Sequence, residues 1–206
     1  MKYLYTVLFI VLISTGSYGQ TKFAISGGYN HNSARILKNN DKQTTGDVPG
    51  FNLGVRMETE FEPPLHFTAF LGYNTRGYTY QALPDSSVET RIHYIDLAPT
   101  FSFNFKTTES SHLNLFAGPL LGIAFSGKQT TKVNGTSSSS DMKFSFSGSY
   151  GYANLAIHAG LGYHFRQFFV EGSYHLGLNS INNEEETDHT NIKLRGFSVN
   201  LGYWLR

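Results

Sequence analysis

Apolar and polar side chains alternate every second residue through about eight stretches between Thr21 and Arg206, and this alternation indicates β-strands with one apolar face. The connections between the stretches are long and short in turn. The long ones fall at residues 31–48, 81–89, 128–148 and 179–191, and the short ones at 62–65, 107–112 and 166–167. A soluble β-sandwich has no reason to sort its loops by length. A barrel in the bacterial outer membrane has short turns on the periplasmic side and long loops outside.

The expected strands are residues 21–30, 50–60, 66–80, 90–106, 113–127, 150–165, 168–178 and 192–206. One face of each is mostly Leu, Ile, Val and Phe, and the other is rich in Gly, Asn, Ser and Thr. Small polar residues suit the narrow interior of a barrel, whereas the wet face of a sandwich would carry many Lys and Glu. We therefore expect an all-β fold, a single eight-stranded antiparallel up-and-down transmembrane β-barrel with both termini in the periplasm. Pro99 and Pro119 fall inside strands, which predicts β-bulges there.

The N-terminus has the pattern of a secretory signal peptide. Lys2 precedes a short apolar run, and the small residues Ser17 and Gly19 stand at the −3 and −1 positions of a cleavage site. We expect a signal peptide at residues 1–19 and a β-barrel domain at 20–206. The alternative is a short N-terminal membrane anchor, although the run is too short to span a bilayer. Export to the bacterial outer membrane follows.

Composition excludes several classes of protein. The 206 residues suit one domain, and a net charge of +1 gives no basic face for a nucleic acid. The absence of cysteine excludes disulfides, thiolate metal sites and a lipidated cysteine.

Three segments resemble a family of small outer-membrane β-barrels, the porin-like or PorT-like outer membrane proteins. They are the strand end Leu71–Gly77, the strand start Tyr94–Leu97, and the segment Phe116–Gly122, which is the most specific. The resemblance covers most of the mature chain and implies the barrel fold. One member resembles a component of a protein-secretion system, and nothing in this chain selects that role.

Eight ionisable residues are expected to point into the barrel as a polar cluster: Arg56, Glu58, Arg76, Asp96, His158, His164, Glu171 and His175. Charges in a crowded interior persist only when they are paired or hydrogen-bonded. We interpret the cluster as a structural plug of Arg–carboxylate pairs. The alternatives are a proton or ligand path, or a catalytic group. A diffusion pore is disfavoured because an eight-stranded barrel has room only for side chains.

Two further patterns contain side chains that could form a site. Glu171, Ser173 and His175 share one strand face, but neighbours two apart lie roughly 6–7 Å from each other, beyond the reach that a nucleophile and its base need. The acidic loop 184–189 offers carboxylates to a divalent cation such as Ca²⁺ or Mg²⁺, yet it lacks the spacing of a calcium loop. Neither pattern predicts a catalytic or metal site.

The prediction is therefore a non-enzymatic outer-membrane protein with a structural or surface-interaction role through its long outer loops. Its expected partner is the lipid bilayer, with no cofactor and no nucleic acid, and the sequence does not identify what the loops bind. One alternative is a narrow channel or an accessory of transport or secretion. A second is a lipid-modifying outer-membrane enzyme.

Overall fold

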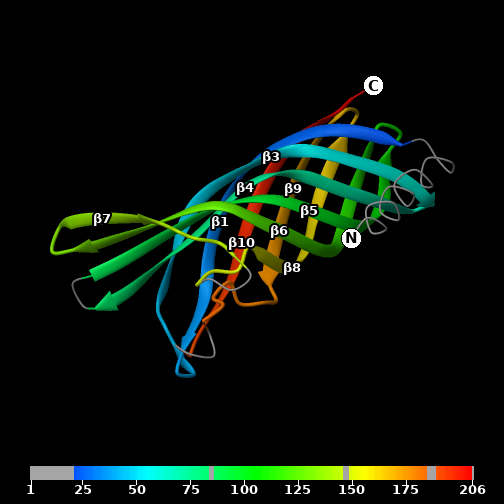
Figure 1. Cartoon of the computed structure of the whole chain (residues 1–206). Helices are drawn as coiled ribbons and strands as arrows, with labels where there is room; N and C mark the ends of the chain where they lie inside the picture. The colour runs from blue at the N-terminus through cyan, green and yellow to red at the C-terminus, as the bar shows by residue number, and fades with distance from the viewer. Residues whose placement is uncertain (1–20, 84–85, 146–148, 185–188, 206) are drawn as a thin grey trace.

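The chain forms a closed antiparallel β-barrel (Figure 1). The computed structural model describes residues 21–83, 86–145, 149–184 and 189–205. Eight strands make the ring: β1 (Lys22–Lys38), β3 (Thr45–Glu62), β4 (Leu65–Leu83), β5 (Ser86–Thr108), β6 (Ser111–Val133), β8 (Ala153–Phe165), β9 (Phe168–Gly177) and β10 (Thr190–Trp204). Two short strands, β2 (Asp41–Lys42) and β7 (Thr136–Asp141), pair with β1 and β6 outside the ring. The expected signal peptide lies outside the described residues.

Each strand of the ring pairs with the next, and β10 closes the ring on β1. The closing pair runs from Ala24 opposite Trp204 to Lys38 opposite Thr190. Closure leaves the ring without an unpaired edge, which is what a sheet needs in order to stand in a membrane. The predicted eight-stranded up-and-down barrel is confirmed.

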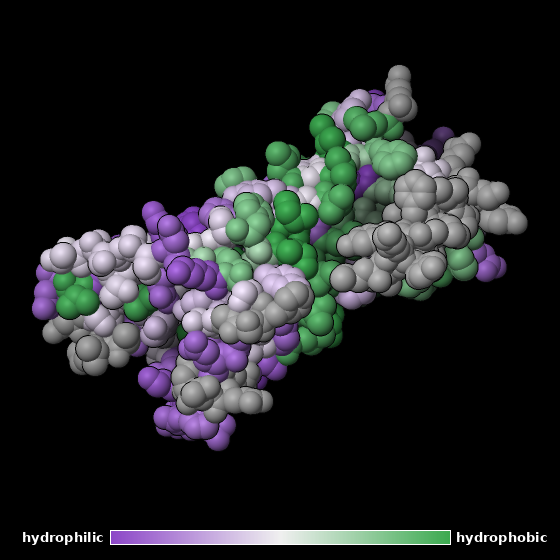
Figure 2. All heavy atoms as spheres, viewed as in Figure 1, coloured by the Kyte–Doolittle hydropathy of each residue, from purple (hydrophilic) through white to green (hydrophobic). Residues whose placement is uncertain are grey.

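An apolar belt surrounds the barrel, because the outward residues of the strands are large and hydrophobic. Hydrophobic residues cover the body of the barrel, and hydrophilic ones gather toward the β7 end (Figure 2). Exposed members of the belt include Phe23, Ile25, Leu53, Val55, Leu71, Leu97, Phe101, Leu115, Leu161, Val170 and Leu201. Such side chains would be unfavourable in water but favourable against lipid. No helix in the described ranges is long and apolar enough to cross a membrane.

The long connections differ from the sequence prediction, because most of their residues continue the strands. β4 and β5 pair up to Leu83 and Ser86, so 81–89 is the end of a hairpin rather than a loop. β6 runs to Val133 and turns back into β7, so 128–141 is also a hairpin. Beyond the membrane both faces of a strand meet water. Its side chains then lose the apolar alternation that marks a strand, while the backbone pairing continues.

The bulges expected at Pro99 and Pro119 are absent, and that prediction is wrong. The two prolines stand opposite each other between β5 and β6, where pairing stops after Leu97–Leu121 and resumes in the same register at Phe101–Ala117. Pro99 still pairs with Ala69 on its other side, and Pro119 with Ile157. The positions of both missing N–H groups thus face the boundary between β5 and β6. The strands keep their register across this gap without the extra residue of a bulge. The β5–β6 register shifts lie elsewhere, between His93 and Tyr94 and between Lys106 and Thr108.

Candidate functional site: the barrel interior and its outer cap

The centre of the barrel holds a buried ion pair between Arg76 of β4 and Asp96 of β5. The Arg76 guanidinium also donates to Asn154 Oδ1 at 3.0 Å and lies 4.8 Å from the centre of the Tyr94 ring. Asp96 has glycine on both sides, with Gly72 as its partner on β4 and Gly122 on β6. A Cβ at Gly122 would stand 2.8 Å from both charged groups. The missing side chains make the room that the guanidinium fills.

A row of asparagine side chains extends this pair around the wall. Asn74 donates to Asp96 at 2.7 Å, and Asn30 donates to Asn74 at 2.6 Å. Asn52 then donates to Asn30 at 2.7 Å and to Asn200 at 2.8 Å. The row joins β10, β3, β1, β4 and β5 through side chains alone. Only the inward position of these asparagines was visible in the sequence, since their contacts depend on the strand register.

A second ion pair, Arg56 with Glu171, fills the barrel nearer to the short turns. Arg56 lies between two aromatic rings, 4.9 Å from the centre of Phe169 and 5.9 Å from that of Phe116. His164 Nε2 lies 3.5 Å from Glu171 Oε1, and the His164 ring stacks on Phe169. Trp204 donates from Nε1 to His164 Nδ1 at 3.3 Å. The pair thus links β3 to β9 across the interior, with aromatic rings packed on Arg56.

The other predicted residues lie inside the barrel but outside these two pairs. Glu58 is buried 3.6 Å from His66 Nδ1, near the end with the short turns. His158 packs edge-on against Phe116 at 5.4 Å. His175 is buried, and its Nε2 has no hydrogen-bond partner among the residues that the structure describes. The structure therefore brings six of the eight residues into contacts with one another or with a neighbouring ionisable group. His158 and His175 face each other on β8 and β9 and take part in neither ion pair.

The outer mouth is closed by an apolar cap that the sequence reading missed. Met142, from the segment after β7, and Ile181, from the segment after β9, are buried among the barrel residues Ile36, Tyr78, Ile92, Tyr94, Ile192 and Leu194. Backbone hydrogen bonds hold the cap, with Ile181 N donating to Ile192 O at 2.9 Å and Gly151 N to Ile181 O at 3.0 Å. Burial in and beside the cap raises the pKa of Tyr78 and of Tyr80 above the usual tyrosine value. In the sequence, the only indication of the cap was that Met142 and Ile181 are single apolar residues within polar segments.

Little empty space remains between the two ion pairs. An internal cavity of about 40 Å³ lies among Arg56, Asn74, Asp96, His158 and His175, with neighbouring residues. This holds a few water molecules at most. The interior is thus filled at three levels: the cap, the Arg76–Asp96 pair and the Arg56–Glu171 pair.

The two remaining candidate sites acquire no supporting geometry. Among the described residues, no hydrogen bond joins Ser173 to His175, and Glu171 is taken by Arg56 and His164. Residues 185–188 of the acidic loop lie outside the described residues. Within the described ranges, no group of three or more His, Cys, Asp or Glu side chains is arranged to hold a metal ion.

Residues 16–183 match the family model of the outer membrane protein β-barrel domain. No curated protein matches the chain. Several solved structures share its architecture. OprG from Pseudomonas aeruginosa is 12% identical over 92% of this chain and 98% of its own, with a TM-score of 0.51.

Two others have lower TM-scores. Ail, the attachment invasion locus protein of Yersinia pestis, is 20% identical over 91% of this chain and 99% of its own, with a TM-score of 0.47. The outer membrane protease OmpT from Escherichia coli is 10% identical over 90% of this chain and 96% of its own, with a TM-score of 0.45. At such identities, likeness shows the fold alone.

Proposed function

Because the chain belongs to the outer membrane protein β-barrel family, we propose that it is a non-enzymatic protein of the outer membrane whose function lies in its outer hairpins. The observation that carries the proposal is a contrast between the two parts of the molecule. The interior is filled with paired charges and capped. In contrast, two polar hairpins, β4–β5 and β6–β7, project beyond the rest of the barrel (Figure 1).

The orientation of the barrel supports this role. The start of β1 at Lys22 and the end of β10 at Trp204 lie beside the short turns. Lys22 is opposite Glu58 near the β3–β4 turn, and Trp204 N donates to Gln167 O at 2.7 Å. Short turns face the periplasm in barrels of this class. The hairpins therefore face the outside of the cell.

The β6–β7 hairpin has the properties of a contact surface. All six residues of β7 are exposed, and Ser137–Ser140 offer hydroxyl groups along both faces. The hairpin is paired from Lys128–Asp141 to Val133–Thr136, so it presents these groups on an ordered backbone. Ordered polar surface can bind a partner at a lower entropic cost than a flexible loop.

Four strains test the proposal against the channel and enzyme alternatives. Three express the native protein, a variant with residues 129–140 replaced by Asn-Gly, and Asp96→Asn, and the fourth lacks the protein. We expect the shortened hairpin to change cell aggregation and attachment to surfaces, with solute uptake and membrane lipid composition unchanged in all strains. A change in uptake in Asp96→Asn would favour the channel, and altered lipids in a strain lacking the protein would favour the enzyme.

A further inference from the structure

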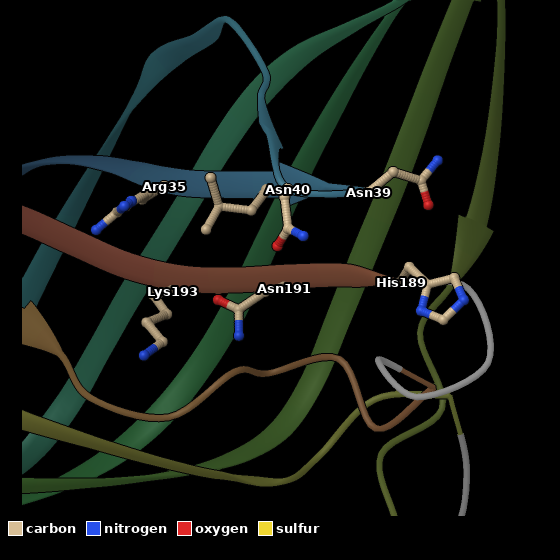
Figure 3. Close-up of a pocket in the computed structure, with 7 residues that line it drawn as sticks. Arg35, Asn39, Asn40, His189, Asn191 and Lys193 are labelled. Carbon is tan, nitrogen blue, oxygen red and sulfur yellow. The ribbon is translucent and has the colours of Figure 1, made fainter.

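A groove of about 510 Å³ lies on the outer wall of the barrel, where β1 and β10 extend past the apolar belt. Arg35 and Lys193 lie at one end of it and Asn39 and His189 at the other (Figure 3). Arg35 is directly opposite Lys193 in the β1–β10 register. The alternate residues Ala34, Ile36, Ile192 and Leu194 are buried inside. The two cations therefore point outward, toward the membrane surface.

The height of the groove places it at the lipid headgroups. On the outward face of β10, Leu201, Val199 and Phe197 are exposed apolar residues, and Arg195 and Lys193 follow at the next two outward positions. Successive outward positions are about 7 Å apart along a strand. The cations thus begin where the apolar belt ends, on the side of the outer hairpins.

The charge of the groove is unbalanced. In the described part of the chain, no carboxylate forms an ion pair with Arg35 or Lys193. Like charges directly opposite each other destabilise a sheet. The nearby Asp47 is engaged by His31 at 2.8 Å. An anion between Arg35 and Lys193 would remove this repulsion.

A similar pair elsewhere on the wall is neutralised by the protein itself. Arg91 is directly opposite Lys128 in the β5–β6 register. Arg91 lies 3.2 Å from Glu89, and Lys128 has Asp141 as its register partner on β7. The Arg91–Lys128 pair thus has acids beside it, whereas no carboxylate within the described residues forms an ion pair with Arg35 or Lys193.

The lining of the groove also suits a phosphate-bearing headgroup. β9 pairs with β10 only as far as Arg195–Leu176, and beyond that point the segment after β9 bonds to β10, with Ile181 N donating to Ile192 O. The strand ends are tied by a hydrogen bond from Asn39 N to His189 O at 3.0 Å. Asn40 and Asn191 line the groove between its two ends (Figure 3). Guanidinium and ammonium groups are the common protein ligands of phosphate.

We propose that this groove binds the phosphate-bearing headgroup of a lipid in the outer leaflet, with Arg35 and Lys193 as the phosphate ligands. The lipid would hold the β1–β10 seam at a fixed depth in the membrane. The site is separate from whatever the hairpins bind.

The test uses the purified full barrel in phosphatidylcholine nanodiscs that contain a minor fraction of lipid A, either phosphorylated or with its phosphates removed. Native mass spectrometry after mild detergent extraction counts the lipid retained on the protein. The native protein should retain phosphorylated lipid A. The double variant Arg35→Gln/Lys193→Gln should retain about tenfold less phosphorylated lipid A, because its charge-assisted contacts to phosphate are lost.

The matched control is Arg91→Gln/Lys128→Gln, which removes an equal charge and should retain lipid as the native protein does. Heat-modifiable gel migration verifies that each variant is folded, and Arg35→Gln alone serves if the double variant is not. Equal retention by Arg35→Gln/Lys193→Gln and the native protein would overturn the proposal. Equal retention of the dephosphorylated lipid by the native protein would also overturn it.

Discussion

Arg76 reaches Asp96 along the barrel rather than straight across it, since Arg76 has Ile92 as its register partner and Asp96 has Gly72. The guanidinium then continues to Asn154 on the far wall of the interior. One side chain therefore connects β4, β5 and β8. This contact is the centre of the filled interior on which the proposed function rests.

Removing one partner of this pair should be costly, because it leaves the other as an unpaired buried charge. We expect Arg76→Ala to lower the free energy of unfolding by about 3–5 kcal/mol. The double variant Arg76→Met/Asp96→Leu should lose less than Arg76→Ala, since it leaves no charge behind. Urea unfolding in lipid vesicles, followed by the fluorescence of the single Trp204, measures both. A double variant less stable than Arg76→Ala would contradict the explanation.

The space beside the pair gives a second prediction. Gly122→Ala places a methyl group 2.8 Å from Arg76 Nη1 and Asp96 Oδ1, so the enclosed pair must shift. We expect a loss of about 1–3 kcal/mol in the free energy of unfolding, as is usual for overpacking. Gly172→Ala is the control, because its Cβ would meet nothing closer than Phe197 at 3.6 Å. Similar losses in both variants would show that the effect belongs to glycine in strands generally.

The apolar cap should control access to the interior from outside. Thr90 is fully buried opposite Tyr78 of the cap, and because the native chain has no cysteine, Thr90→Cys provides a single reporter. A water-soluble maleimide should label Thr90→Cys slowly. Adding Ile181→Ser should speed labelling markedly, since a polar group at this position weakens the cap. Unchanged labelling in folded protein would mean that the cap does not close the mouth.

Replacing the two facing prolines should create backbone amides that are protected from hydrogen exchange. In Pro99→Ala/Pro119→Ala, each new N–H faces the carbonyl of the opposite residue, and the β5–β6 ladder can close. Hydrogen exchange should show both new amides as protected as those of Leu97 and Phe101. Fast exchange at these two amides would contradict the assignment of both gaps to one seam.

The period of two in the sequence was enough to find the barrel and the inward orientation of Arg56, Arg76, Asp96 and Glu171. It could not give their pairing, because Arg76 and Asp96 are joined by an offset of four residues between neighbouring strands, which depends on register. The local pattern determines which face of the sheet a side chain lies on, whereas the strand register determines which side chains it contacts.

The outer region was predicted less well for a physical reason. In the β6–β7 hairpin both faces meet water, so Lys128–Asp141 shows no alternation although its backbone is paired. Ile181 and Met142 are single apolar residues in polar segments, and only their assembly from different loops makes a cap. Pro99 and Pro119 suggested two bulges because the sequence does not show that they face each other.

The central claim is that the interior is closed, and electrical recording tests it most directly. The native protein is reconstituted into planar lipid bilayers bathed in concentrated KCl, with a known porin inserted separately to verify the membranes. We expect folded, inserted protein to leave the bilayer current at baseline, because the cap and two ion pairs occupy the lumen. Reproducible stepwise conductance from the native protein would contradict the account.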